Sequence, residues 1–177
     1  HLQTDALLYT GRELNRYRYL GLFDGRVSRI YGSDAGLPDE ELKAACERTP
    51  GVVLLAWASG LKEFNASTGK TRPAKGLAGL AGKEIGQLVC APGEPVWALT
   101  SGDELFVELD GDVRRLDLTG LGLAGKPQLV LRDERAGRFI IGERGILRHL
   151  EGHWRPLHLD PDAFDFRVRD VEIDDVG

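Results

Sequence analysis

The chain has no methionine, only two cysteines and no long apolar run among its 177 residues. Because methionine is absent, His1 is not a native translation start, and we expect a processed or excised piece of a longer protein. The longest uncharged apolar run, residues 52–58, is far too short to span a bilayer. No basic segment followed by an apolar one opens the chain, so no signal peptide is visible. These absences predict a chain that does not insert into a membrane.

Clusters of basic residues are also missing. The chain has 23 Lys and Arg against 28 Asp and Glu, a formal net charge of −5, and the basic residues form no runs. A nucleic-acid binder usually carries a basic stripe, so this class of partner is excluded. Cys46 and Cys90 are too few for a disulfide scaffold, and we expect two small buried thiols.

Glycine, in contrast, is abundant and regularly spaced. The 23 glycines include three series that keep the same phase along the chain, with steps of 40 to 44 residues. The series are Gly51, Gly93, Gly137 and Gly177; Gly60, Gly102 and Gly145; and Gly25, Gly69, Gly111 and Gly152. A period of this length predicts a repeat architecture.

Short apolar or alternating runs lie between these glycines, as expected for β-strands that end in turns. Asp-Gly at 24–25 and 110–111 and Glu-Gly at 151–152 suit tight hairpins. One unit is therefore four antiparallel strands in about 42 residues, the unit of a β-propeller blade. The innermost strands are predicted at 42–46, 85–90, 128–132 and 168–173. Residues 38–46 could alternatively form a helix.

Residues 31–70, YGSDAGLPDEELKAACERTPGVVLLAWASGLKEFNASTGK, resemble the two-component-regulator propeller repeat. They share its Gly-Leu-Pro opening, inner strand, turn, tryptophan-containing strand and outer hairpin. The second copy keeps Trp97, and the third keeps Asp133 with Phe139 and Ile140 at the Leu-Trp positions. The resemblance implies a sensor or recognition domain, often the periplasmic input of a hybrid histidine kinase. Rings of this family usually have seven or more blades.

The repeat divides the chain into blade-lengths 1–50, 51–92, 93–136 and 137–177. By strand, the chain runs from strands two to four of one blade, through three full blades, to a lone inner strand. Two arrangements follow. The lone strand could pair beside residues 6–10 and close a four-bladed ring, or the chain could be an arc that a second copy or the remainder of a parent chain completes. Exposed strand edges need such cover.

His149, His153 and His158 have the spacing of a metal site, but the strand register argues against one. With Glu151-Gly152 as a two-residue turn, His149 pairs with Trp154 and His153 with Leu150, so the imidazoles point to opposite faces. The acidic groups at 39–41, 160–165 and 170–175 are interpreted as polar strand faces and loops. We therefore expect no metal and no cofactor.

The fold predicted is all-β, and the function predicted is non-enzymatic recognition of a polar ligand or a protein partner. The turns before each inner strand and after each second strand share one face, and rigid scaffolds carry binding on such loops. Their charged residues are Arg12, Glu13, Asp39, Glu40, Lys83, Glu84, Asp103, Lys126, Glu143, Arg144 and Arg167. The alternative is a propeller lyase or hydrolase with histidine and carboxylates at the axial mouth. The resemblance implies the periplasm; otherwise the cytoplasm is expected.

Overall fold

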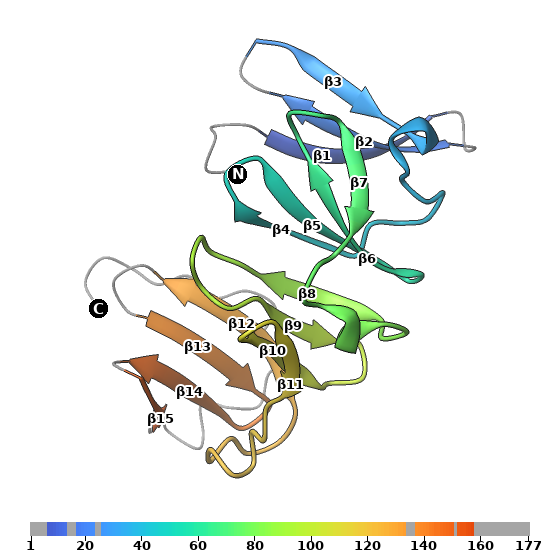
Figure 1. Ribbon diagram of the computed structural model, residues 1–177. Coiled ribbons are helices and arrows are strands. Elements are labelled where there is room, and N and C mark those ends of the chain that lie inside the picture. Colours follow the sequence, from blue (N-terminus) through green and yellow to red (C-terminus); the bar gives the residue numbers. More distant parts are fainter. Residues whose placement is uncertain (1–6, 14–16, 24–25, 134–136, 151, 158–177) are drawn as a thin grey trace.

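The computed structural model describes residues 7–13, 17–23, 26–133, 137–150 and 152–157. Fifteen strands and two short 3-10 turns make up the regular structure of these residues, which contain no α-helix (Figure 1). The all-β prediction is confirmed. The strands form one three-stranded and three four-stranded antiparallel sheets. In each sheet, strands that follow one another in the sequence are neighbours.

Each sheet is a meander of short neighbouring strands. The first sheet comprises β1 (Leu7–Glu13), β2 (Tyr17–Phe23) and β3 (Ser28–Tyr31). The second sheet comprises β4 (Ala44–Thr49), β5 (Val52–Trp57), β6 (Gly60–Asn65) and β7 (Lys70–Pro73). The third sheet comprises β8 (Ile85–Val89), β9 (Trp97–Thr100), β10 (Leu105–Leu109) and β11 (Asp112–Arg115), and the fourth comprises β12 (Pro127–Asp133), β13 (Gly137–Gly142), β14 (Gly145–Leu150) and β15 (His153–Leu157). The 3-10 turns η1 (Ser33–Ala35) and η2 (Ala78–Leu80) lie between sheets.

The sheets follow one another in a row, and their first strands are neighbours. β4 contacts β8, and β8 contacts β12, so the first strands of three successive sheets lie side by side (Figure 1). β8 and β12 match the strands predicted at 85–90 and 128–132 to within one residue at each end, whereas β4 lies two to three residues later than the strand predicted at 42–46. The alternative helix at 38–46 is wrong, because Ala44–Thr49 is a strand and residues 38–43 are not helical. The segment 168–173 lies outside the described residues.

The apolar run of β5 owes its composition to burial on both faces. Val53 and Leu55 pack into the core between the first and second sheets, whereas Leu54 and Ala56 pack into the core between the second and third. Side chains alternate between the faces of a strand, so a strand covered on both sides is apolar at every position. Trp57 joins the first of these cores, and Trp97 packs between the third and fourth sheets, as expected for packing between units.

The hairpin turn at 110–111 has the predicted backbone. Asp110 and Gly111 both have positive φ, 55° and 83°, which is the geometry that a two-residue turn between twisted strands requires. Gly152 also has positive φ, at 80°. The Asp-Gly turn at 24–25 lies outside the described residues.

The two cysteines correct the prediction of buried free thiols. Cys46 in β4 and Cys90, which directly follows β8, form a disulfide with a Cα–Cα distance of 5.5 Å, and both side chains are only half-buried. The prediction failed because a count of cysteines says nothing about whether two inner strands are neighbours. Their separation of 44 residues is close to the repeat step, and this was the signal in the sequence.

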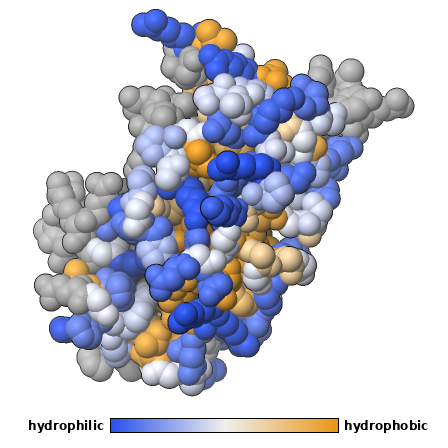
Figure 2. All heavy atoms as spheres, viewed as in Figure 1, coloured by the Kyte–Doolittle hydropathy of each residue, from blue (hydrophilic) through white to orange (hydrophobic). Residues whose placement is uncertain are grey.

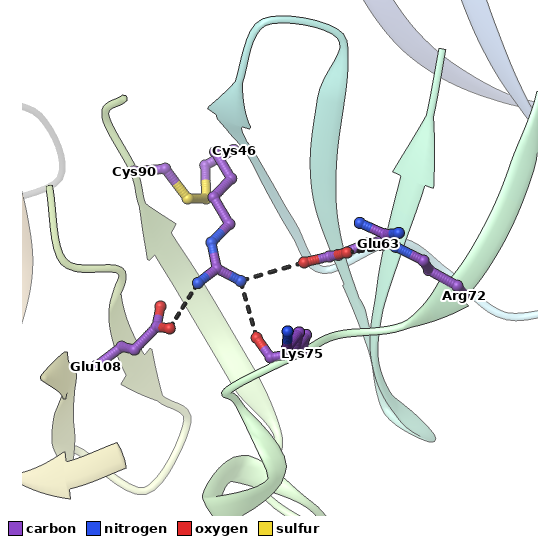
Figure 3. A network of polar contacts seen from close by, with 7 residues as sticks. Cys46, Glu63, Arg72, Lys75, Cys90 and Glu108 are labelled. Atoms are coloured by element: carbon purple, nitrogen blue, oxygen red, sulfur yellow. Dashed lines mark hydrogen bonds and ion pairs between the residues drawn. A yellow bond between two sulfur atoms is a disulfide. The ribbon is translucent and has the colours of Figure 1, made fainter. Parts of the chain in front are cut away.

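An arginine beside the disulfide also joins the second and third sheets. The Arg48 guanidinium donates to Glu63 Oε1 in β6 (3.1 Å), to the Lys75 carbonyl (2.9 Å) and to Glu108 Oε1 in β10 (2.5 Å) (Figure 3). Arg72 donates to the other oxygen of Glu63. The two sheets are thus held by a covalent bond and by a network of charged hydrogen bonds.

Candidate functional site

The turns expected to share one face do lie together. In the second sheet, the Ser59 amide between β5 and β6 donates to Glu40 Oε2, before β4, at 2.9 Å. In the third, the Ser101 amide donates to the Glu84 carbonyl at 2.9 Å. In the fourth, the Lys126 amide donates to Glu143 Oε2 at 3.2 Å. We call this set of turns, residues 39–40, 59, 83–84, 101–104, 126 and 143–144, the turn face.

Ion pairs connect the charged residues of the turn face. Lys83 Nζ lies 3.0 Å from Glu104 Oε2, and Lys126 Nζ lies 2.7 Å from Asp103 Oδ2 across the seam between the third and fourth sheets. The hydrogen bond from Lys83 lowers the pKa of Glu104, and the bond to Asp103 raises the pKa of Lys126. Because each of these side chains keeps about a third or more of its surface exposed, such pairs add little stability and can exchange partners.

A pocket of about 350 Å³ lies at this end of the seam. It runs between the start of β10, the segment after β11 and the start of β12, and Asp103 and Lys126 both line it, together with Glu104 and Arg115. Arg115 pairs with Glu104 at 3.1 Å. The wall therefore offers donors and acceptors of both charges, as a polar ligand requires.

The remaining predicted residues contribute unequally. Asp39 and Arg144 are exposed on turns of the turn face but do not line the pocket. Arg12 and Glu13 close β1, and their side chains lie outside the description, as does Arg167 entirely. The structure thus brings Asp103 and Lys126 to the pocket and leaves the other described side chains elsewhere on the turn face, namely Asp39, Glu40, Lys83, Glu84, Glu143 and Arg144.

The histidines have the predicted register. His149 pairs with Trp154 and Leu150 with His153, so the two imidazoles leave opposite faces of the hairpin. His149 instead packs against Trp154, with ring centroids 4.7 Å apart and the ring planes tilted by 44°. Among the described residues, no group of three or more His, Cys, Asp and Glu is placed to hold a metal. Both imidazoles lie on the third and fourth strands of their sheet, away from the row of first strands where the enzyme alternative needs them.

A second and larger pocket, of about 500 Å³, was missed by the sequence reasoning. It lies at the opposite end of the same seam, because β10 and β12 each have one end at this pocket and the other end at the pocket of the turn face. Its wall includes Glu94, Trp97, Arg132, Arg138, His149 and Trp154. The alternation of an aromatic or aliphatic residue with arginine near the turns was the signal, and it is weak without knowledge of which sheets meet.

Comparison with known proteins gives likeness in fold alone. No family model matches the chain, and no curated protein matches it. A solved structure of the extracellular domain of a one-component system from B. thetaiotaomicron matches 90% of this chain with a TM-score of 0.60 and 11% identity. PorZ, a surface component of the type-IX secretion system of Porphyromonas gingivalis, matches 84% with a TM-score of 0.52 and 15% identity.

The chain spans less than a quarter of either structure, 23% and 22% of their lengths. Within the residues described, no helix is long and apolar enough to cross a membrane. No family model confirms the resemblance to the propeller repeat, and the likeness to these two structures is one of fold. The chain is an all-β protein that shares the arrangement of its sheets with part of these larger bacterial proteins.

Proposed function

We propose that the chain is part of a larger β-propeller that serves as a non-enzymatic recognition module, and that it binds a polar ligand or a protein partner through the turn face. Three successive four-stranded meanders with neighbouring first strands support the propeller. The two structural neighbours, which belong to a one-component system and to a surface component, support sensing or binding.

The pocket of the turn face carries this proposal. It holds the Asp103–Lys126 pair and the Glu104–Arg115 pair within one concave site between two rigid sheets. A ligand that has both an acidic and a basic group can replace these pairs one for one. Hydrophilic side chains also cover most of the face seen in Figure 2, where hydrophobic ones form separate patches.

The disulfide supports a location outside the cytoplasm. Disulfides persist in oxidising compartments and are rare where glutathione keeps thiols reduced. Cys46–Cys90 joins two sheets, so the cross-link stabilises the arrangement of the units. A sensor-like domain in the periplasm or at the cell surface agrees with this chemistry.

The first sheet supports completion by further sheets. Leu20 and Leu22 face the second sheet, whereas Phe23 and Ile30 lie on the other face, with 37% and 64% of their surface exposed. The corresponding faces between successive sheets are buried. We favour an open arc that a second copy or the rest of a parent chain completes over a closed four-bladed ring.

A ligand screen tests the recognition site. The chain is titrated with amino acids and dipeptides while its melting temperature is followed. We expect stabilising zwitterionic ligands whose effect is abolished in the Asp103→Asn, Lys126→Gln double variant and kept in Arg155→Gln, an exposed arginine on β15. Stabilisation that the double variant retains, or no stabilisation by any zwitterion, would contradict the site.

A further inference from the structure

We propose that the second pocket, here named the aromatic pocket, binds a small aromatic carboxylate. It lies at the far end of the seam from the turn face, so this site is additional to the recognition site above. Its wall combines an apolar half and a charged half, and the ligand is deduced from each half in turn. A volume of about 500 Å³ suits a small molecule.

The apolar half suits a flat ring. The rings of Trp97 and Trp154 are arranged edge to face, with centroids 5.7 Å apart. The His149 ring packs against Trp154 at a tilt. Leu109 and Leu150, two of the few large apolar side chains that the described residues leave exposed, stand at the same pocket. Burial of these surfaces against an aromatic ring is favourable, and edge-to-face contacts add to it.

The charged half is built around one carboxylate. Glu94 accepts hydrogen bonds from Arg132 Nη2 at 2.8 Å and from Arg138 Nη2 at 2.5 Å. The Arg138 guanidinium also lies 4.6 Å from the centre of the Trp97 ring. The hydrogen bond from Arg132 lowers the pKa of Glu94, so this side chain is ionised at neutral pH. Asp133 also lines the pocket, so the wall is balanced in charge. Net charge therefore does not select the ligand.

Unpaired donors select it instead. Among the described residues, two buried side-chain polar atoms lack a hydrogen-bond partner, Trp97 Nε1 and Arg138 Nε. Both belong to side chains that line this pocket, both residues are at least nine-tenths buried, and both atoms are donors. Buried donors are normally satisfied, and these two call for an acceptor. An ammonium or guanidinium group has donors only and cannot satisfy them.

A carboxylate can reach these donors by replacing Glu94. The two N–H groups are covered in this state, so access requires movement of a neighbouring side chain. Glu94 is 38% exposed and sits on a turn, whereas Arg138 is held at 9%. The incoming carboxylate then takes the place of Glu94 on Arg138 and presents its second oxygen to the unpaired Nε edge. Its ring lies against Trp154 and the two leucines.

Phenylacetate serves as the probe, with the three tryptophan indole N–H signals as reporters in a ¹H–¹⁵N NMR titration. We expect saturable shifts of the Trp97 and Trp154 signals with a Kd on the order of 1 mM, ordinary for a ten-atom ligand. Trp57, in the core between the first and second sheets, is the internal control and should not move. Acetate, which lacks the ring, and phenylacetamide, which lacks the charge, should each bind about tenfold more weakly.

Variants separate the site from unspecific effects. Arg132→Gln should weaken phenylacetate about tenfold, and Leu150→Ser, an exposed position that cannot unfold a core, should weaken it several-fold. The matched control Arg155→Gln should leave the affinity unchanged. The proposal is overturned if phenylacetate causes no saturable shift, if Trp57 shifts to the same extent, or if phenylacetamide binds as tightly. The turn-face double variant should bind phenylacetate normally, so failure of one proposal is distinct from failure of the other.

Discussion

At the scale of single residues, one turn glycine differs from its counterparts in the repeat. Gly51 and Gly93 lie before the second strand of their sheets and Gly137 is the first residue of β13, and all three have positive φ, of 76°, 72° and 93°. A Cβ at Gly51 or Gly93 would meet nothing within 4 Å, whereas a Cβ at Gly137 would collide with the carbonyl oxygen of His149. Of these three glycines, only Gly137 therefore lacks the space for a side chain.

We predict that Gly137→Ala lowers the free energy of unfolding by about 3 kcal/mol, from backbone strain plus the collision. Gly51→Ala is the matched control and should lower it by about 1 kcal/mol, because it carries the strain alone. Urea denaturation of both variants measures the difference. Equal losses would mean that β13 and β14 are not in contact as described.

His149 provides a prediction on pH. Burial, followed by the charge of Arg138, lowers the pKa of its imidazole below 6.5. The folded state therefore binds this proton less tightly than the unfolded state. The contribution to stability is present above the unfolded pKa of about 6.5 and is lost as pH falls through the window below it. An NMR titration of the His149 ring should give a midpoint below 6.5, and a midpoint above that value would contradict the packing against Trp154.

At the scale of elements, one face of β4 makes the contacts between the second and third sheets. Ala44 and Cys46 pack into the core shared with the third sheet, and Arg48, two residues on, reaches Glu63 and Glu108. Both carboxylates are at most 10% exposed. Removing the arginine takes a charged partner away from both carboxylates, although Glu63 keeps its pair with Arg72.

We predict that Arg48→Met lowers the free energy of unfolding by about 3 kcal/mol. Lys43→Met is the control, because it removes an exposed pair with Glu41 and should change stability by less than about 0.5 kcal/mol. Thermal or urea denaturation compares them. If Arg48→Met were no worse than the control, the second and third sheets would not meet as the structure places them.

The elements were more predictable than their contacts. The glycine period located β4, β8 and β12, and the Glu151-Gly152 turn set the register of His149 with Trp154, because these are local properties of the chain. The disulfide and the aromatic pocket depend on which faces of two sheets meet across more than forty residues. Composition and spacing say little about which sheet faces meet. The grouping of the turns at one end of the sheets could therefore be predicted, whereas the aromatic pocket at the other end of the seam could not.

At the scale of the whole molecule, the Cys46–Cys90 bond closes a loop of 44 residues across two sheets. Loop-closure entropy of that length corresponds to about 4 kcal/mol in the unfolded state. We predict that the Cys46→Ala, Cys90→Ala double variant loses about 2–4 kcal/mol of unfolding free energy. A reducing agent should lower the stability of the natural chain by a similar amount and leave the double variant unchanged. Free thiols in the oxidised protein, measured by alkylation and mass spectrometry, would contradict the bond.

The central claim is that these sheets are units of a larger propeller, and that a further sheet covers the exposed face of the first sheet. Light scattering on the purified chain tests it most directly, with Ile30→Asp as the companion variant, since Ile30 is the most exposed large apolar residue among the side chains described for the first sheet. The account predicts a mass above that of a single chain for the natural sequence and a shift toward the single chain for Ile30→Asp, because a charge on the open face blocks sheet stacking. A stable monomer of single-chain mass for the natural sequence, with the amides of residues 6–10 and 167–173 protected from hydrogen exchange, would contradict the open arc and indicate a closed four-bladed ring.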